Sequence, residues 1–323
     1  MRARLVLASL SLVATVAHAD DGAIGSLGTN RFFPPAPIEG LGTVTAIASS
    51  TATTCAIVGG EVFCWGWMAA LAGGADTHVP TKLPGLAHVT QLSVGSAGAC
   101  ARLASGQVRC FGRDFGGPQP RPVANLARAQ KVSVTNIGAC ALRDDGRVLC
   151  WTAAKPAARA TPIADAVDVT ANLLDACAAR KDGTVVCFRV DDPARQRPIP
   201  HIKEAISVTA QGHDVTCALE KSGAVKCWAD DWPDGSRGPC GVSDGGAALG
   251  DHTPVAVLRS GGVVSIGLGN CGAQPREGVA DAVEASGTCA LRRDGAVLCW
   301  GRNDHGELGR PPQPTSFPAR RKY

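Results

Sequence analysis

Fourteen cysteines are the residues of this chain with the clearest capacity for chemistry. Cysteine side chains can bind zinc, react as thiolates or pair in structural disulfides. Zinc sites are built from Cys-x-x-Cys pairs or from clustered Cys and His, and neither pattern occurs here. Twelve of the cysteines instead form pairs whose members stand nine or ten residues apart: Cys55 and Cys64, Cys100 and Cys110, Cys140 and Cys150, Cys177 and Cys187, Cys217 and Cys227, and Cys289 and Cys299. This short, regular spacing favours structural disulfides.

The last of these pairs shows which element the spacing predicts. Two apolar arms flank the loop Arg293-Asp294-Gly295, and glycine suits the left-handed position that ends a three-residue hairpin loop. Centring the loop on Asp294 places Cys289 directly opposite Cys299, within disulfide range. We therefore predict a β-hairpin closed by a covalent bond.

The same hairpin pattern recurs through the chain. Each copy has Ala after its first position, then a loop glycine, a Val and a bulky apolar residue after its last position. The sixth copy has Val255 and Ser265 in place of the two cysteines, and the loss of both partners together is what pairing predicts. The seven predicted hairpins span residues 55–64, 100–110, 140–150, 177–187, 217–227, 255–265 and 289–299.

Two cysteines remain, on either side of the sixth hairpin. Cys240 and Cys271 are left once the other twelve are paired, so we predict a bridge between them that spans the one hairpin without its own. The alternative is a reactive thiol pair. An oxidising compartment favours the bridge.

The first 19 residues predict that the compartment is outside the cytoplasm. Arg2 and Arg4 precede an apolar run that ends in Ala17-His18-Ala19, the pattern of a signal peptide with its cleavage site. Removing 1–19 lowers the formal charge from +4 to +2, because two arginines and no acids are lost. We expect an exported protein, periplasmic or extracellular, without membrane insertion, and this near-neutral charge argues against nucleic acid as a partner. Residues 20–323 are predicted to form one domain and a monomer.

Segments around each hairpin complete a larger unit. A short alternating strand, such as Gln91–Gly95, precedes each hairpin, and a Pro-bearing piece, such as Val79–Leu83, follows it. Because proline is tolerated at a sheet edge, the Pro-bearing piece should be the outermost strand. Seven such four-stranded units, starting 34 to 45 residues apart, predict an all-β fold, a seven-bladed β-propeller. The stretch Pro35 to Gly40 should lie beside the last blade, near Phe317 to Arg321, and close the ring.

The repeat also resembles a known family. The inner strand, the Asp-Gly-x-Val turn, the Trp-Gly ending and the sequence Trp300-Gly-Arg-Asn-Asp-His-Gly-Glu-Leu-Gly309 are similar to regulator-of-chromosome-condensation repeats. The resemblance extends over nearly all of residues 20–323 and implies a seven-bladed propeller. The namesake of that family acts on chromatin and a small GTPase. This chain departs from it in its predicted export, near-neutral charge and cysteine pairs, so neither activity is carried over.

Residues outside the repeat pattern are the candidates for function. Asp230, Asp231 and Trp232 lie in the longest insertion, where an aromatic ring beside carboxylates is plausible protein-binding chemistry. Trp67 and Phe115 follow the first two hairpins, and they could pack between blades or contact a partner.

We find no nucleophile motif and no histidine pair at metal spacing. Gly267-Leu-Gly-Asn-Cys-Gly272 has the spacing of a dinucleotide-binding glycine loop, but it lies between two predicted hairpins and not in a strand–turn–helix unit, so we interpret it as a turn between blades. We therefore expect no catalytic residue, cofactor or metal.

These observations predict an exported, non-catalytic scaffold that binds a protein through the connections between its blades, as expected where variable loops sit on a rigid fold. The alternative is an enzyme, a lyase or hydrolase, with its site at the propeller axis. That alternative requires acidic and histidine side chains to converge at the axis. The predicted scaffold requires aromatic and charged loop residues on one rim.

Overall fold

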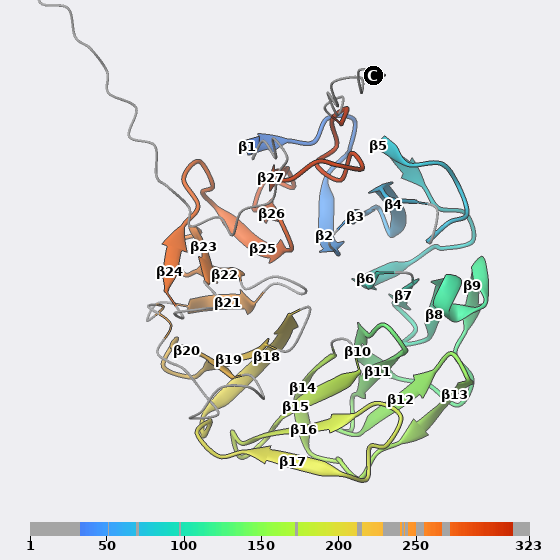
Figure 1. Cartoon of the computed structure of the whole chain (residues 1–323), viewed down its shortest axis with the longest axis vertical. Coiled ribbons are helices and arrows are strands. Elements are labelled where there is room, and N and C mark those ends of the chain that lie inside the picture. Colours follow the sequence, from blue (N-terminus) through green and yellow to red (C-terminus); the bar gives the residue numbers. More distant parts are fainter. Residues whose placement is uncertain are drawn as a thin grey trace, which may run out of the picture. The chain divides into compact units, whose positions relative to one another are not determined.

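The computed structural model describes residues 33–50, 52–68, 71–96, 98–171, 174–211, 215–228, 240, 242, 245–249, 255–266 and 272–312. These residues form seven antiparallel sheets, which follow one another around a common axis (Figure 1). The seven-bladed propeller is confirmed. The predicted signal peptide, residues 1–19, and the tail Phe317 to Arg321 lie outside the described residues.

Each blade begins with an inner strand, the one nearest the axis in Figure 1. Alternating apolar residues place these strands against the blades on either side. In blade order, from the first to the seventh, they are β2 (Val44–Ser49), β6 (Val89–Val94), β10 (Ala129–Val134), β14 (Ala166–Ala171), β18 (Ala205–Gln211), β21 (Gly245–Leu249) and β25 (Ala282–Ser286).

The hairpins that follow have the predicted register. Cys289 faces Cys299 and Leu291 faces Val297, and the six predicted disulfides are confirmed, with paired Cα atoms 3.9–4.1 Å apart. The hairpin strands are β3 (Thr53–Val58) with β4 (Glu61–Gly66), β7 (Gly98–Leu103) with β8 (Val108–Gly112), β11 (Gly138–Arg143) with β12 (Val148–Thr152), β15 (Asp175–Arg180) with β16 (Val185–Arg189), β19 (Val215–Glu220) with β20 (Val225–Trp228), β22 (Val255–Leu258) with β23 (Val263–Ile266), and β26 (Cys289–Arg292) with β27 (Val297–Gly301).

The Pro-bearing pieces are outermost, as predicted, and the last blade obtains its outer strand from the other end of the chain. The β1 strand pairs with β27, so Ala36 faces Cys299. The ring is thus closed by a sheet that combines strands from both ends of the chain. The fifth blade has three strands within the described residues. The outer strands are β5 (Thr77–Lys82), β9 (Gly117–Pro122), β13 (Lys155–Ala160), β17 (Gln196–Ile199), β24 (Ala273–Pro275) and β1 (Phe33–Pro37), and a short 3-10 helix, η1 (Arg113–Phe115), precedes β9.

The glycine in each hairpin turn has two structural roles. Its φ is positive, for example +83° at Gly183, which penalises any other residue. At six of the turns the glycine carbonyl also accepts a hydrogen bond from the first residue of the next inner strand, as Gly183 O does from Ala205 N at 3.0 Å; these are Gly60, Gly106, Gly146, Gly183, Gly261 and Gly295. A Cβ at Gly183 would collide with the carbonyl of Lys203. The turn glycine therefore permits the tight hairpin turn, and its lack of a side chain lets the backbone that leads into the next blade pack closely against it.

The core lies between neighbouring blades rather than inside each one. Ile57 and Val62 of the first blade share a buried cluster with Leu92 and Phe111 of the second. Because both faces of each sheet are covered in this way, no blade has a complete core without its neighbours. No helix in the described part of the chain is long and apolar enough to cross a membrane.

Candidate functional site

The inner strands carry a row of hydroxyl side chains that join successive blades near the axis. The hydroxyl oxygen faces the next inner strand and accepts a hydrogen bond from a buried backbone N–H of that strand. These bonds are Val134 N to Ser93 Oγ at 3.0 Å, Ala171 N to Ser133 Oγ at 2.9 Å, Ala210 N to Thr170 Oγ1 at 2.8 Å and Ser49 N to Ser286 Oγ at 2.9 Å. Each satisfies an inner-strand donor that the sheet itself leaves unpaired.

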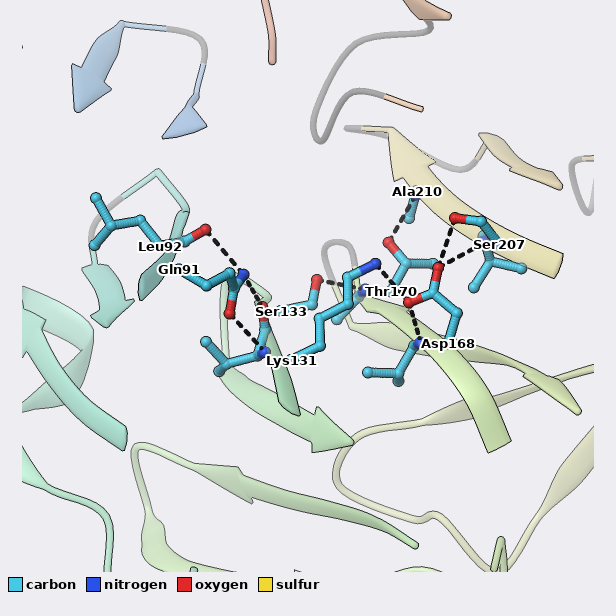
Figure 2. A network of polar contacts seen from close by, with 12 residues as sticks. Gln91, Leu92, Lys131, Ser133, Asp168, Thr170, Ser207 and Ala210 are labelled. Atoms are coloured by element: carbon cyan, nitrogen blue, oxygen red, sulfur yellow. Dashed lines mark hydrogen bonds and ion pairs between the residues drawn. The ribbon is translucent and has the colours of Figure 1, made fainter. Parts of the chain in front are cut away.

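A second polar row lies two residues earlier on the same strands. Gln91 of the second blade is bonded in both directions to Val132 of the third: its Nε2 donates to Val132 O, and its Oε1 accepts from Val132 N, both at 2.9 Å. This side chain thus extends backbone pairing across two separate sheets, as Figure 2 shows.

An ion pair continues this row between the third and fourth blades. Lys131 Nζ lies 2.7 Å from Asp168 Oδ1, and the two side chains are 27% and 10% exposed. The Oδ1 atom also accepts from Val169 N, while Oδ2 accepts from Ser207 Oγ at 2.6 Å and from Val208 N at 3.0 Å (Figure 2). Asp168 therefore joins the inner strands of three successive blades, β10, β14 and β18.

This geometry assigns the axial carboxylate a structural role. A general base or metal ligand needs an available lone pair, whereas both oxygens of Asp168 accept two contacts each. The inner strands within the described residues carry one further acid, Glu284, and no histidine. Among those residues, no group of three or more His, Cys, Asp or Glu could hold a metal ion.

Asp168→Ala should lower the free energy of unfolding by about 3 kcal/mol, because it removes the ion pair with Lys131 and the acceptor of the buried Val208 N–H. Urea unfolding followed by circular dichroism measures this loss. Ser207→Ala removes one of the four contacts and should cost only about 1 kcal/mol. In Lys131→Ala/Asp168→Ala the two losses should not add, since the charges are then removed together; strict additivity would contradict the proposed coupling.

A different cluster lies where the last and first blades meet, at the connections that follow the hairpins. The Trp67 ring lies 6.0 Å from the His305 ring, and His305 Nδ1 is 2.9 Å from Asp76 Oδ2. The His305 and Asp76 side chains are 42% and 40% exposed, and Trp67 is partly exposed. We call Trp67, Asp76 and His305 the Trp67 cluster.

The loop that carries His305 is anchored on the first blade. Glu307 O accepts from the indole Nε1 of Trp65 at 2.8 Å and from Thr54 Oγ1 at 3.1 Å. Burial raises the pKa of the Glu307 carboxyl, even though it accepts from the backbone N–H groups of Asp304 and His305. The contacts of Glu307 with Trp65 and Thr54 therefore hold the loop that carries His305 against the first blade.

The same loop falls within the part of the chain that matches a family model. Residues 285–307 match the regulator of chromosome condensation (RCC1) repeat. The last blade of the propeller therefore contains a match to an RCC1 repeat. No curated protein sequence matches this chain.

Three solved structures similar to this propeller are distant from it in sequence. Prp20p from Saccharomyces cerevisiae, whose binding to Gsp1p and histones is described, is 16% identical, with a TM-score of 0.59 over 81% of this chain and 84% of that one. The WD40 propeller domain of Doa1 is 11% identical, with a TM-score of 0.56 over 84% and 97%. PorZ, a surface component of the type-IX secretion system of Porphyromonas gingivalis, is 11% identical, with a TM-score of 0.55 over 79% and 36%. At these identities the similarity shows the fold alone.

The structure separates the candidates that the sequence suggested. Phe115 packs in the cluster between the second and third blades and lies against Gly98, whereas Trp67 is partly exposed beside His305. Asp230, Asp231 and Trp232 lie outside the described residues. Cys240 is fully buried and disulfide-bonded. Its predicted partner, Cys271, also lies outside the described residues, so that pairing stays a prediction.

Proposed function

We propose that this propeller is an exported, non-catalytic scaffold that binds a protein partner through the connections that follow its hairpins. These connections include residues 66–79, 112–122 and 228–246. The repeated polar residues support this proposal, because they are used between blades: the hydroxyl row, Gln91 and Asp168 all bond to a neighbouring inner strand.

The Trp67 cluster is the observation that carries the proposal. Tryptophan is enriched in binding hot spots, and the partly exposed Trp67 has an imidazole and a carboxylate beside it that can supply polar contacts. Fixed contacts through Glu307 hold the cluster in place, so little ordering entropy would be lost on binding. The structural relatives agree at the level of fold, since Prp20p binds other proteins.

The third connection is proposed on sequence alone. Asp230, Asp231 and Trp232 repeat the chemistry of the Trp67 cluster, an aromatic ring with carboxylates, in the longest connection of the chain. We therefore include Trp232 among the partner contacts.

Truncating a hot-spot aromatic typically costs 2 kcal/mol or more, so Trp67→Ala and Trp232→Ala should each weaken partner binding roughly thirtyfold. The partner would first be identified by crosslinking residues 20–323 in the periplasmic and extracellular fractions, and affinities then measured by calorimetry. Val167→Thr is the matched control, because Val167 is 43% exposed on the inner strand β14 and lies outside the proposed connections. Full affinity in both tryptophan variants would refute the loop contacts, and turnover of a small substrate would refute the non-catalytic role.

A further inference from the structure

The strand that closes the ring has few backbone donors of its own. Proline occupies three of the five positions of β1, namely Pro34, Pro35 and Pro37, and proline has no N–H. The register of β1 on β27 also shifts between Phe33 and Ala36. Because β1 is the outermost strand of the last blade, it can detach from β27 without breaking any hairpin.

The side chain of Arg310 adds donors where β1 lacks them. Its Nη2 donates to Cys299 O on β27 at 3.1 Å and to Pro34 O on β1 at 3.4 Å. Its guanidinium carbon also lies 4.9 Å from the centre of the Phe33 ring, which is a cation–π contact. One guanidinium group therefore binds both strands of the closing pair.

The two residues before Arg310 pack on the same N-terminal segment. Leu308 is buried in one cluster with Ile38 and Trp65. Gly309 has no room for a side chain, because a Cβ there would lie 2.6 Å from Ile38 Cδ1. Gly309 and Arg310 therefore contact the segment that closes the ring, and Leu308 shares its core.

Hydrogen bonds within the loop connect Arg310 to His305. Asn303 is buried, and its Nδ2 donates to Arg310 O at 3.0 Å. Glu307 is also buried, and its Oε2 accepts from His305 N at 2.8 Å. We call residues 303–310 the strap. Its conformation is fixed from the ring closure at one end to the Trp67 cluster at the other.

The propeller fold does not require the strap. In the third blade, Trp151 follows the second cysteine of its hairpin as Trp65 does in the first, but its buried Nε1 has no acceptor among the described residues. The connection that packs near Trp151 contains η1, with Phe115 in the same cluster. In the first blade, Trp65 Nε1 donates to Glu307 O of the strap. A blade can therefore form without that bond.

We propose that the strap couples closure of the ring to the Trp67 cluster. Detachment of β1 would remove the contacts of Arg310 with Pro34 and Phe33, and the loop that positions His305 would lose its support on that side. Conversely, the contact between His305 and Asp76 favours the closed ring, because a coupling free energy between two sites is reciprocal.

The coupling has a consequence for partner binding, and this consequence rests on the proposed function. A partner that binds the Trp67 cluster would hold β1 on β27, and an open ring would bind that partner more weakly. The coupling itself needs no partner and can be measured in the free protein. Its failure would therefore leave the proposed loop contacts untouched.

The test measures detachment of β1 by hydrogen exchange and mass spectrometry on the oxidised protein, residues 20–323. Arg310→Met keeps the apolar stem and removes the donors, so exchange in the peptide covering 33–38 should be about tenfold faster or more. The imidazole signal of His305 in the NMR spectrum should shift in the same variant. Arg159→Met, an exposed arginine on the outer strand β13, is the matched control and should change neither readout.

The reciprocal half of the test starts from the Trp67 cluster. Asp76→Asn weakens a contact that does not touch β1, yet exchange in 33–38 should be about two- to fivefold faster, the range that a partly exposed ion pair allows. Asp192→Asn, an exposed residue in the connection after the fourth hairpin, is its control. Exchange in residues 138–143 of the third blade reports global unfolding and should stay at the wild-type rate in every variant.

Three results would overturn the proposal. Arg310→Met could leave exchange in 33–38 unchanged, so that this side chain does not hold β1. The same variant could release β1 while the His305 signal keeps its wild-type position. Asp76→Asn could leave exchange in 33–38 at the wild-type rate, which would show that the coupling is not reciprocal. Because Asp76 is exposed, this last variant decides the question even where Arg310→Met lowers the stability of the whole protein.

Discussion

Reduction of the disulfides should unfold the propeller at neutral pH and room temperature. Six bridges close loops of nine or ten residues, and each is expected to contribute roughly 2 kcal/mol. Their sum is on the order of 10 kcal/mol, which is similar to the whole free energy of unfolding of a typical domain. Circular dichroism of the protein with and without reductant, across a urea series, measures the effect. A urea midpoint unchanged by reductant would contradict it.

The chain supplies its own matched control for a single bridge. Cys177→Val/Cys187→Ser copies the sixth hairpin into the fourth blade and should lower the free energy of unfolding by about 2 kcal/mol. The reverse change, Val255→Cys/Ser265→Cys, should add a bridge, because these two residues are directly opposed. Opposite signs for the two variants would separate the effect of the bond from the effect of the side chains.

Deleting residues 20–40 should lower the free energy of unfolding by roughly 4 kcal/mol or more. The deletion removes the buried Ile38, the bond from Ile38 N to Val297 O and the whole of β1, so β27 becomes an unprotected edge. For a chain of this size the melting temperature should fall by about 6 °C or more. Differential scanning calorimetry and light scattering would detect the lower transition and the associated aggregation.

The control for this deletion stops before the strand. Removing residues 20–31 leaves β1 in place and should leave the melting temperature unchanged. Equal melting temperatures for the wild type and the 20–40 deletion would show that β1 does not stabilise the ring.

The sequence was sufficient to predict what is local to one repeat. Hairpin register follows from turn length, so the loop around Asp294 alone predicted that Cys289 faces Cys299. Proline content placed β5 and β9 at the outer edge, because a missing N–H is tolerated only there. Both inferences depend on chain geometry within about 20 residues.

Contacts between blades were not predictable in the same way. Ser93, Ser133 and Thr170 each stand seven residues before the first cysteine of their hairpin, and this recurrence was the available signal. In a single strand, however, an alternating hydroxyl residue indicates only a polar face. Whether that hydroxyl reaches the backbone of the next inner strand depends on the angle between neighbouring blades. The pairing of Lys131 with Asp168 depends on the same angle, as does the support of Trp65 by Glu307.

The pairing of β1 with β27 in the last blade also sets the order in which the disulfides and the closed ring can form, for a chain that emerges from its N-terminus. Each of the six bridges joins cysteines only nine or ten residues apart, so each bridged hairpin can be oxidised correctly as soon as it appears. The pairing of Phe33 with Gly301 has to wait for nearly the whole chain, and closing so long a loop is slow. The nascent protein therefore acquires its covalent bonds early and its circular topology last. Until that step β27 lacks its outer partner, so the final blade is where a chaperone would be most useful.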